Sequence, residues 1–389
     1  MTFGSAIRSQ WLLDKDITFL NHGSFGACPK KVLAVQRGFQ EQMEHEPVRF
    51  MKREFPAEMA KNIAKLSSFV GAKSENLVLV ENATMGINAV LRSLMPSFAK
   101  GDELLTTSHV YGAVGKTMKY VSDISGATVV QAEVPFPINS AEQIIEALRS
   151  KITSKTRLVL FDHITSPTGI VFPVKELIAI FKEKGIPIII DGAHAPGMVD
   201  LDLETLGADY YTGNCHKWLF APKGAAFLWV APEHRSKIHP TVISQDYGAS
   251  FQEEFAWTGT RDFTPWLSIG AGIDFLNEIG IQQSREYIKP ILHEARKIIT
   301  KAMDVEYASP IEMLETMVAF PLPGNPKASP EYIDSLHDII FDEYKIEVPI
   351  LQVNGHCYLR ISVNVYNELP DYQKLADVLP IIFKNGVIR

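Results

Sequence analysis

Short runs of consecutive apolar residues alternate with amphipathic stretches from about residue 76 to residue 230. Consecutive apolar positions are typical of strands buried on both faces, whereas apolar residues at helical spacing are typical of surface helices. Seven runs have the character of strands: Asn76–Val80, Glu103–Thr107, Ala127–Gln131, Arg157–Phe161, Pro187–Asp191, Tyr210–Thr212 and Ala225–Val230. Helical patterns such as Ser140–Arg149 and Pro173–Lys184 lie between them. This alternation predicts an α/β fold with a mostly parallel seven-stranded sheet flanked by helices.

Different patterns precede and follow this region. Two helical stretches come before it, one from after Pro29 to about His45 and one over Phe50–Val70. After Arg261 there are two long helical patterns and three short strands: Pro265–Ile279, Gln282–Met303, Met317–Phe320, Ile346–Ile350 and Tyr358–Val363. We therefore predict a large α/β domain over residues 19–261 and a smaller α+β domain over 262–389. Residues 1–18 are predicted to pack with the small domain.

Composition narrows the class of protein. The chain has 389 residues, 46% of them hydrophobic, and a net charge of −7, which argues against binding to nucleic acid or to an anionic membrane. Its three cysteines form no C-x-x-C pair, so we expect neither a metal site nor a disulfide framework. No apolar run reaches the ~18 residues of a membrane span, and the first residues lack the apolar core of a signal peptide. We expect a cytoplasmic protein.

The chemistry is concentrated at strand ends, where open α/β sheets bind their ligands. Asp191 ends a buried strand, and Lys217 follows the next strand about two dozen residues later. A lysine that forms a Schiff base and an aspartate that keeps a pyridine nitrogen protonated are what a pyridoxal 5'-phosphate (PLP) enzyme requires. The alternative is that Asp191 and Lys217 form an ion pair with a purely structural role.

A phosphate group is bound well by the free N–H groups at a helix N-terminus. The segment Asn82-Ala83-Thr84 follows the first core strand and leads into a helical pattern over Met85–Leu94, so it supplies such a terminus. His216, next to Lys217, is placed to donate to the same phosphate.

Together these motifs resemble the class V aminotransferase family of fold-type I PLP enzymes, in particular its isopenicillin N epimerase-like branch. The resemblance covers nearly the whole chain and rests on motifs that occur in the order of the family: Phe19–Gly26, Asn82–Thr84, His109–Gly112, Ser166–Gly169, Asp191–His194, His216–Trp218, Trp257–Asp262 and Leu359–Ser362.

The resemblance implies a role for each matching residue. Lys217 would carry PLP covalently, Asp191 would contact the pyridine nitrogen, and His194 would lie near the ring hydroxyl. Ala83, Thr84 and His216 would bind the phosphate. Either His109 or Tyr111 would stack on the ring, and Arg360 would bind the α-carboxylate of an amino-acid substrate.

The family also assembles its site across a homodimer. By resemblance, Gly259 and Thr260 would reach the phosphate held by the partner subunit. Asn21 and His22 would lie over the substrate, with a capping or packing role as the alternative for His22.

The motifs identify the family, but they do not identify which reaction of the family the chain catalyses. The shared step is removal of the Cα proton of an amino acid, with Lys217 as the natural base. Epimerisation would need a second acid or base, for which His22, His109 and Tyr111 are candidates, and we rank it first, followed by C–S lysis and transamination. Cys357 lies inside a predicted strand, so transfer of sulfur to a protein thiol is disfavoured. A catalytically inactive PLP-fold binding protein is the alternative that is not an enzyme; the presence of both Lys217 and Asp191 argues against it.

Overall fold

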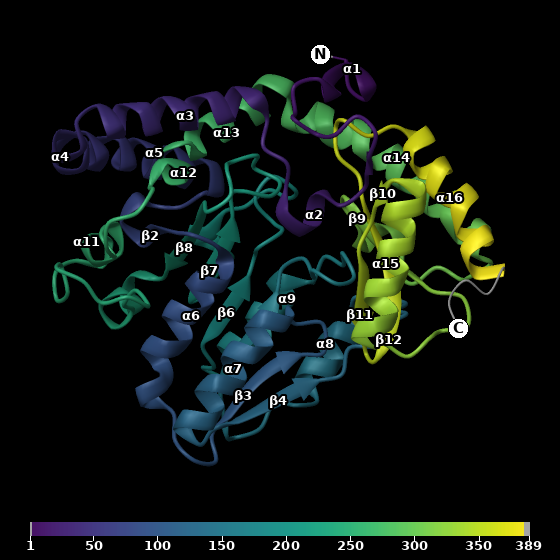
Figure 1. The fold of residues 1–389 in the computed structure, drawn as a ribbon. Helices are drawn as coiled ribbons and strands as arrows, with labels where there is room; N and C mark the ends of the chain where they lie inside the picture. Colours follow the sequence, from purple (N-terminus) through teal and green to yellow (C-terminus); the bar gives the residue numbers. More distant parts are fainter. Residues whose placement is uncertain (1, 385–389) are drawn as a thin grey trace.

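The structure, a computed structural model that describes residues 2–384, is built around one large sheet (Figure 1). Residues 1 and 385–389, at the ends of the predicted first and last segments, lie outside the described residues. The sheet has seven strands in the order β2-β8-β7-β6-β5-β3-β4. Their bounds are Leu77–Val80 (β2), Glu103–Thr107 (β3), Thr128–Ala132 (β4), Thr156–Asp162 (β5), Ile188–Asp191 (β6), Tyr210–Asn214 (β7) and Ala226–Val230 (β8). All seven predicted strands are confirmed.

The sheet is parallel except at one strand. β8 runs antiparallel to both of its neighbours, β2 and β7, and all other pairs are parallel. The carboxyl ends of the other six strands therefore lie along the same edge of the sheet. The predicted, mostly parallel α/β architecture is confirmed, and this edge is where a ligand is expected.

Both faces of the sheet are buried, and alternate strand residues belong to two separate hydrophobic clusters. On β5, Leu158 and Leu160 pack into one cluster, and Val159 and Phe161 pack into the other. Helices α6 (Ala83–Leu94) and α7 (Gly112–Ser125) cover the first face. Helices α8 (Glu142–Arg149), α9 (Val174–Glu183) and α5 (Phe55–Val70) contribute to the cluster on the second face. Burial on both faces explains why these strands are apolar at consecutive positions.

A layer of helices crosses the top of the molecule in Figure 1. It contains α3 (Lys30–His45), α5, α12 (Thr264–Leu267) and α13 (Ile269–Ile279). Two predicted helices differ in detail: the stretch Phe50–Val70 begins with a π-helical turn over Phe50–Glu54, after the short α4 (Pro47–Arg49), and the stretch Pro265–Ile279 is interrupted at Ser268. Because α12 and α13 follow residue 261 and yet pack on α3 and α5, the boundary at residue 261 stays a proposal.

The C-terminal part is a three-stranded antiparallel sheet with helices. The sheet has the order β11-β12-β9, and α14 packs on α16. Its elements are α14 (Ile281–Met303), β9 (Met317–Pro321), α15 (Pro330–Tyr344), β11 (Ile350–Val353), β12 (His356–Ser362) and α16 (Leu369–Lys384). None of the helices within residues 2–384 combines the length and the apolar character required to cross a membrane.

The prediction of one strand over Ile346–Ile350 is wrong. The segment divides into β10 (Ile346–Glu347), which pairs with β1 (Thr18–Phe19), and β11, which pairs with β12. Pro349 lies between the two, and proline has no N–H to donate to a strand ladder, so the segment changes partner there.

The N-terminal segment lies against this C-terminal part and then turns toward the sheet. It contains α1 (Ser5–Arg8), β1 and α2 (His22–Phe25). Gly26 ends α2 with a φ of +69°, and a Cβ at this position would lie 2.1 Å from the carbonyl oxygen of His216. Glycine is therefore required here on both counts, and its small size lets α2 pack directly over the backbone that carries Lys217.

Candidate active site

Three ionisable side chains meet at the carboxyl edge of the sheet. Asp191 ends β6, Asp162 ends β5 directly opposite it in the strand register, and Lys217 follows β7. All three are buried. Asp162 was missed in the sequence, although it carries the same signal as Asp191, a carboxylate at the end of a buried strand, because the predicted strand stopped at Phe161.

Lys217 is held in an environment that favours its neutral form. Its Nζ lies 3.0 Å from Nε2 of His194. Burial lowers the pKa of Lys217 to about 7, the positive charge of Arg360 adds to the effect, and Asp191 and Asp162 oppose it. A large fraction of the amine is therefore unprotonated near pH 7, as a base or a nucleophile requires.

The two carboxyl groups have different surroundings. Oδ1 of Asp191 accepts a hydrogen bond of 2.9 Å from the amide of Ala193, whereas Oδ2 of Asp162 is buried without a partner among the described residues. Burial raises the pKa of both groups, and the charge of Asp191 raises that of Asp162 further, well above its ordinary value. We infer that Asp162 carries the proton and that Asp191 is the ionised member of the pair.

The N-terminus of α6 faces the same edge. Asn82 caps the helix by accepting from the amide of Met85 (2.9 Å), and the amide of Ala83 donates to Oδ1 of Asn214 (2.8 Å). The amide of Thr84, between them, has no acceptor within the described chain. Gly86 allows the helix to approach β7, since a Cβ there would lie 2.5 Å from Oγ1 of Thr212. This terminus suits an anion.

His216 lies beside Lys217, but its ring is already engaged on one side. Its Nδ1 donates to the carbonyl oxygen of Ala225 (3.0 Å), and burial lowers its pKa to about 4. In the neutral ring Nε2 is therefore an acceptor. His216 donates to a phosphate only if the negative charge of that phosphate draws a proton onto it.

The two candidates for ring stacking differ in exposure. His109 is completely buried, its Nδ1 lies 3.3 Å from Oγ1 of Thr168, and its Nε2 has no partner within the described residues. Tyr111 is 46% exposed at the start of α7. The geometry favours His109 as the flat neutral group, because burial also lowers its pKa to about 4.

Arg360, on β12, is buried and anchored at both ends of its guanidinium. Nη1 donates to the carbonyl oxygen of Ser166, and Nη2 donates to Oγ of Ser24 (3.2 Å) and to Oδ1 of Asn21 (3.4 Å). Its Nε is buried without a partner among the described residues. The N-terminal segment thus positions Asn21 beside Arg360, and their predicted roles in binding the substrate stay a proposal.

His22 is buried beneath this segment with both ring nitrogens in use. Its Nε2 lies 3.0 Å from the carbonyl oxygen of Lys217, and its Nδ1 lies 2.7 Å from the hydroxyl of Tyr366. Burial lowers its pKa to about 3. This environment fits a packing role, the alternative given above, better than that of an acid or base over the substrate.

Gly259 and Thr260 lie in the loop after α11 (Phe251–Ala256), and Thr260 is exposed. The loop is held by the ion pair of Arg261 with Glu81 (2.6 Å), at the residue before the cap of α6. No hydrogen bond joins Gly259 or Thr260 to the Lys217 group within the described chain, so their predicted role in a partner subunit stays a proposal.

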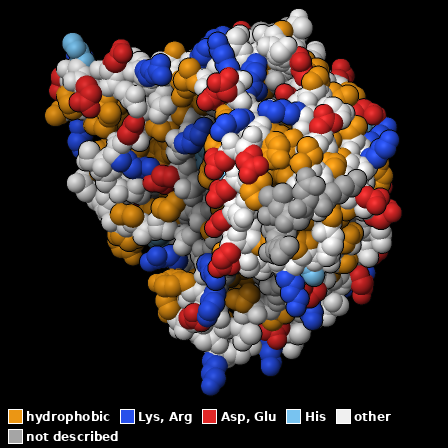
Figure 2. Space-filling view, turned by 45° about the vertical axis from the view of Figure 1, so that its right-hand side comes forward, with side chains coloured by type: hydrophobic (Ala, Val, Ile, Leu, Met, Phe, Trp, Pro, Cys, Tyr) orange, Lys and Arg blue, Asp and Glu red, His pale blue; other side chains and the backbone are white. Residues whose placement is uncertain are grey.

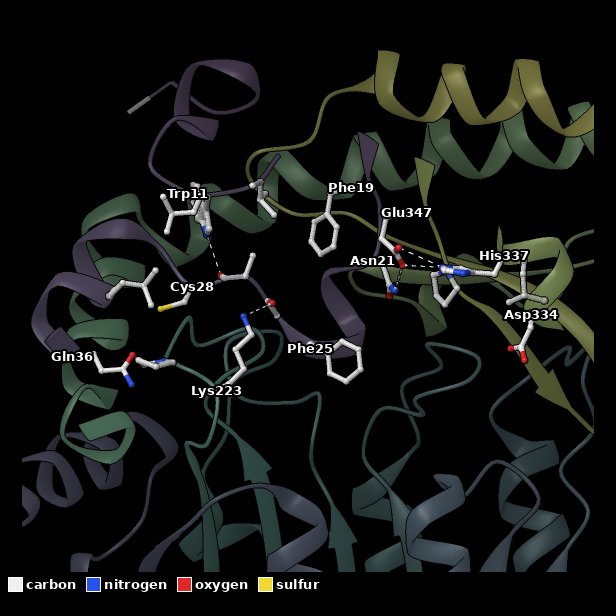
Figure 3. A pocket seen from close by; sticks show the side chains of 18 of the residues that line it. Trp11, Phe19, Asn21, Phe25, Cys28, Gln36, Lys223, Asp334, His337 and Glu347 are labelled. Carbon is white, nitrogen blue, oxygen red and sulfur yellow. Dashed lines mark hydrogen bonds and ion pairs between the residues drawn. The ribbon is translucent and has the colours of Figure 1, made fainter. Parts of the chain in front are cut away.

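Two cavities lie close to Arg360. The larger, of about 1130 Å³, lies between the N-terminal segment, α3 and α15, and Asn21, Phe25, Lys223, His337 and Glu347 are among its lining residues (Figure 3). A smaller one, of about 630 Å³, is lined by Tyr111, Ser166 and Asn354 among others. Because Arg360 bonds to Asn21 and to Ser166, its guanidinium lies between residues of the two walls. Figure 2 shows a deep groove on one face of the molecule, with charged side chains along its edges.

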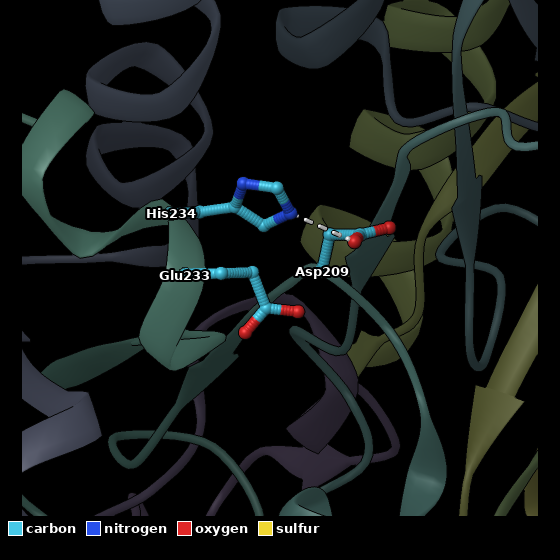
Figure 4. A group of neighbouring side chains, drawn as sticks. All are labelled: Asp209, Glu233 and His234. Atoms are coloured by element: carbon cyan, nitrogen blue, oxygen red, sulfur yellow. Dashed lines mark hydrogen bonds and ion pairs between the residues drawn. The ribbon is translucent and has the colours of Figure 1, made fainter.

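One group of side chains within the described residues has the composition of a metal site: Asp209, Glu233 and His234 (Figure 4). Asp209 precedes β7, and Glu233 and His234 follow β8, which runs antiparallel to β7. The group therefore lies at the opposite end of β7 from Asn214 and Lys217. Both oxygens of Asp209 are already used, by Nε2 of His234 (3.0 Å) and by the amide of Ile188 (2.7 Å). We therefore assign this group to holding the strand ends together.

Several buried polar atoms at the edge fit PLP. Nε2 of His109, Oδ2 of Asp162 and Nε of Arg360 lack partners among the described residues, and buried polar groups are normally paired. A helix terminus for the phosphate, an ionised aspartate for the ring nitrogen and a neutral lysine for the aldehyde are the groups that bind this cofactor.

Comparison with known proteins identifies the family of the chain. Residues 23–375 match the family described as aminotransferase class-V. A putative L-cysteine desulfhydrase from Oryza sativa subsp. japonica is 34% identical, over 94% of this chain and 83% of that protein. The isopenicillin N epimerase of Amycolatopsis lactamdurans is 31% identical, over 97% and 98% of the two chains. A cysteine desulfurase from Thermococcus onnurineus NA1 has the same fold, with a TM-score of 0.83 at 19% identity and 99% coverage of both chains.

Proposed function

Because this chain belongs to the aminotransferase class-V family of PLP-dependent enzymes, we propose that it eliminates sulfide from a cysteine-like amino acid. The site supports removal of a Cα proton by Lys217, as the sequence predicts. Among the reactions that can follow, we favour C–S lysis over epimerisation, which ranked first from the sequence.

The residues divide the work as follows. When bound, PLP supplies an electron sink joined to the substrate nitrogen. Asp191, the ionised carboxylate, would hold the ring nitrogen in its protonated form, and the amide of Thr84 would bind the phosphate. Lys217 would carry the cofactor covalently between turnovers. Arg360 would orient the substrate through its carboxylate, which fixes the Cα–H bond relative to Lys217.

The reaction balances with water as the only other reactant. Nζ of Lys217 takes the Cα proton, the electron pair of that C–H bond forms the Cα–Cβ double bond, and the Cβ–S bond breaks with its pair on sulfur. The sulfide leaves as hydrogen sulfide after it gains a proton. The released enamine is hydrolysed to a keto acid and ammonia.

The hydrogen bonds that His22 already makes are the observation that favours elimination over epimerisation. Inversion at Cα needs an acid or base on each side of the substrate, and elimination needs only one. The ring nitrogens of His22 are occupied by Tyr366 and by the Lys217 carbonyl oxygen, and Tyr111 is exposed at the start of α7. Cys357 is a free cysteine buried in β12, as predicted, so sulfur is released rather than transferred to that thiol.

Epimerisation is the second candidate because of His109. Its Nε2 is buried without a partner among the described residues, which leaves one nitrogen available to a substrate. The likeness to isopenicillin N epimerases supports the same reading.

Incubation of the holoenzyme with L-cysteine in deuterium oxide separates the reactions. We expect hydrogen sulfide and pyruvate in equal amounts, and the loss of both in Lys217→Ala. Deuterated D-cysteine without sulfide would establish epimerisation instead. If neither L-cysteine nor cystine releases sulfur or pyruvate, the proposal is wrong.

We also propose a homodimer in which Gly259 and Thr260 reach the phosphate of the partner subunit. Their place in a loop held next to the α6 terminus supports this, since a symmetric neighbour would present the same loop. The three buried free cysteines suit a reducing compartment, so a cytoplasmic location is part of the proposal.

A further inference from the structure

Behind Lys217, three buried side chains form a line of hydrogen bonds. Nε1 of Trp218 donates to Nδ1 of His194 over 3.2 Å, and Nε2 of His194 lies 3.0 Å from Nζ of Lys217. All three residues are at most 8% exposed. The sequence places Trp218 next to Lys217 without showing that its indole turns toward His194.

We propose that Trp218 is a positioning residue that fixes the tautomer of His194 and thereby keeps the amine of Lys217 neutral. An indole N–H is a donor only, so the nitrogen that it contacts must be without a proton. Nδ1 of His194 is that nitrogen, and in a neutral imidazole the proton then resides on Nε2.

The second hydrogen bond follows from the first. With its proton on Nε2, His194 donates to Lys217, and Nζ accepts only through the lone pair of the neutral amine. The imidazolium form is excluded as well, because a proton on Nδ1 would face the indole N–H. Burial and the neighbouring positive charges also lower the pKa of His194 well below its ordinary value.

Without the indole N–H, the hydrogen bond between His194 and Lys217 can reverse its direction. The proton of His194 is then free to move to Nδ1, and Nε2 becomes an acceptor for a protonated Lys217. The ionisable groups that face Lys217 (Asp191, Asp162 and Arg360) stay in place, as do His22 and His216 near His194. A change in the protonation of Lys217 would therefore arise from the indole alone.

Trp218→Phe is the matched variant. It keeps an aromatic ring against His22, whose ring centroid lies 4.7 Å from that of Trp218, and it removes the N–H donor together with part of the indole ring. The control is Trp229→Phe on β8, which loses a different indole hydrogen bond, to Oε1 of Glu204 (3.0 Å).

Two measurements on the apoprotein test the proposal. Nitrogen NMR of ¹⁵N-histidine-labelled protein reports the tautomer of His194, with His194→Asn to assign the signal. We expect Nδ1 unprotonated and Nε2 protonated in the natural protein. The rate at which Lys217 forms an imine with added PLP, followed by absorbance, should rise with pH through a midpoint near 7, because the neutral amine is the reactive form.

In Trp218→Phe we expect a proton on Nδ1 and an upward shift of that midpoint by about one pH unit, the size of one net hydrogen bond. In Trp229→Phe neither should change. An unchanged tautomer and midpoint in Trp218→Phe, or an equal shift in both variants, would overturn the proposal. A protonated Nδ1 in the natural protein would overturn it without any variant. None of these measurements involves sulfur chemistry, so their outcome is independent of whether the enzyme eliminates sulfide.

Discussion

Replacement of Arg360 tests how the site recognises an amino acid. Its Nε is buried without a partner among the described residues, and Nη2 makes only bonds of 3.2 and 3.4 Å. A carboxylate that replaces one of these long bonds therefore accepts from two N–H groups, Nε and Nη2. Charge-assisted hydrogen bonds are each worth about 1.5–3 kcal/mol. With part of this offset by water, Arg360→Met should cost about 3 kcal/mol of binding, which is roughly a hundredfold in Kd. Arg360→Lys keeps the charge but loses the fork, and should cost about tenfold.

L-alanine and ethylamine make the assay specific, because they differ only by the carboxylate. Their apparent Kd values for the holoenzyme follow from the change in cofactor absorbance on titration. In Arg360→Met we expect the Kd of L-alanine to rise about a hundredfold and that of ethylamine to stay within about threefold. Titrations are compared above pH 8, because the loss of Arg360 also raises the pKa of Lys217. Equal weakening of both ligands would show that Arg360 only supports the fold, and the reasoning would be refuted.

Three further changes test other parts of the site. Asp162→Asn should leave the free energy of urea unfolding within about 0.5 kcal/mol, because a protonated carboxyl and an amide have the same shape; a loss of several kcal/mol would mean that Asp162 is ionised. Gly26→Ala should destabilise the fold by at least the ~1–3 kcal/mol of a left-handed residue, and should reduce the borohydride-trapped cofactor on Lys217; normal melting and trapping would contradict the close packing of α2. Cys357→Ala should release sulfide at the rate of the natural enzyme, and loss of that release would show that the thiol takes part.

The sequence was sufficient to predict those features that depend on residues close together in the chain. Runs of consecutive apolar residues identify buried strands, and Asp191 and Lys217 at the ends of neighbouring strands predict that the site lies at the carboxyl edge. These signals are carried by residues close together in the chain. The same reasoning would have found Asp162, had the strand been extended by one residue.

The tertiary structure alone decided what each side chain contacts. His22 bonds to Tyr366, 344 residues away, and to Lys217, 195 residues away, and no local pattern contains such partners. The division of Ile346–Ile350 between two sheets likewise depends on β1 and β12 being available as partners. Trp218 and His194 meet because β6 and β7 are adjacent in the sheet. Hydrogen-bond partners, and with them the protonation states that decide the reaction, are set by distances in space, which the order of residues fixes only through the complete fold.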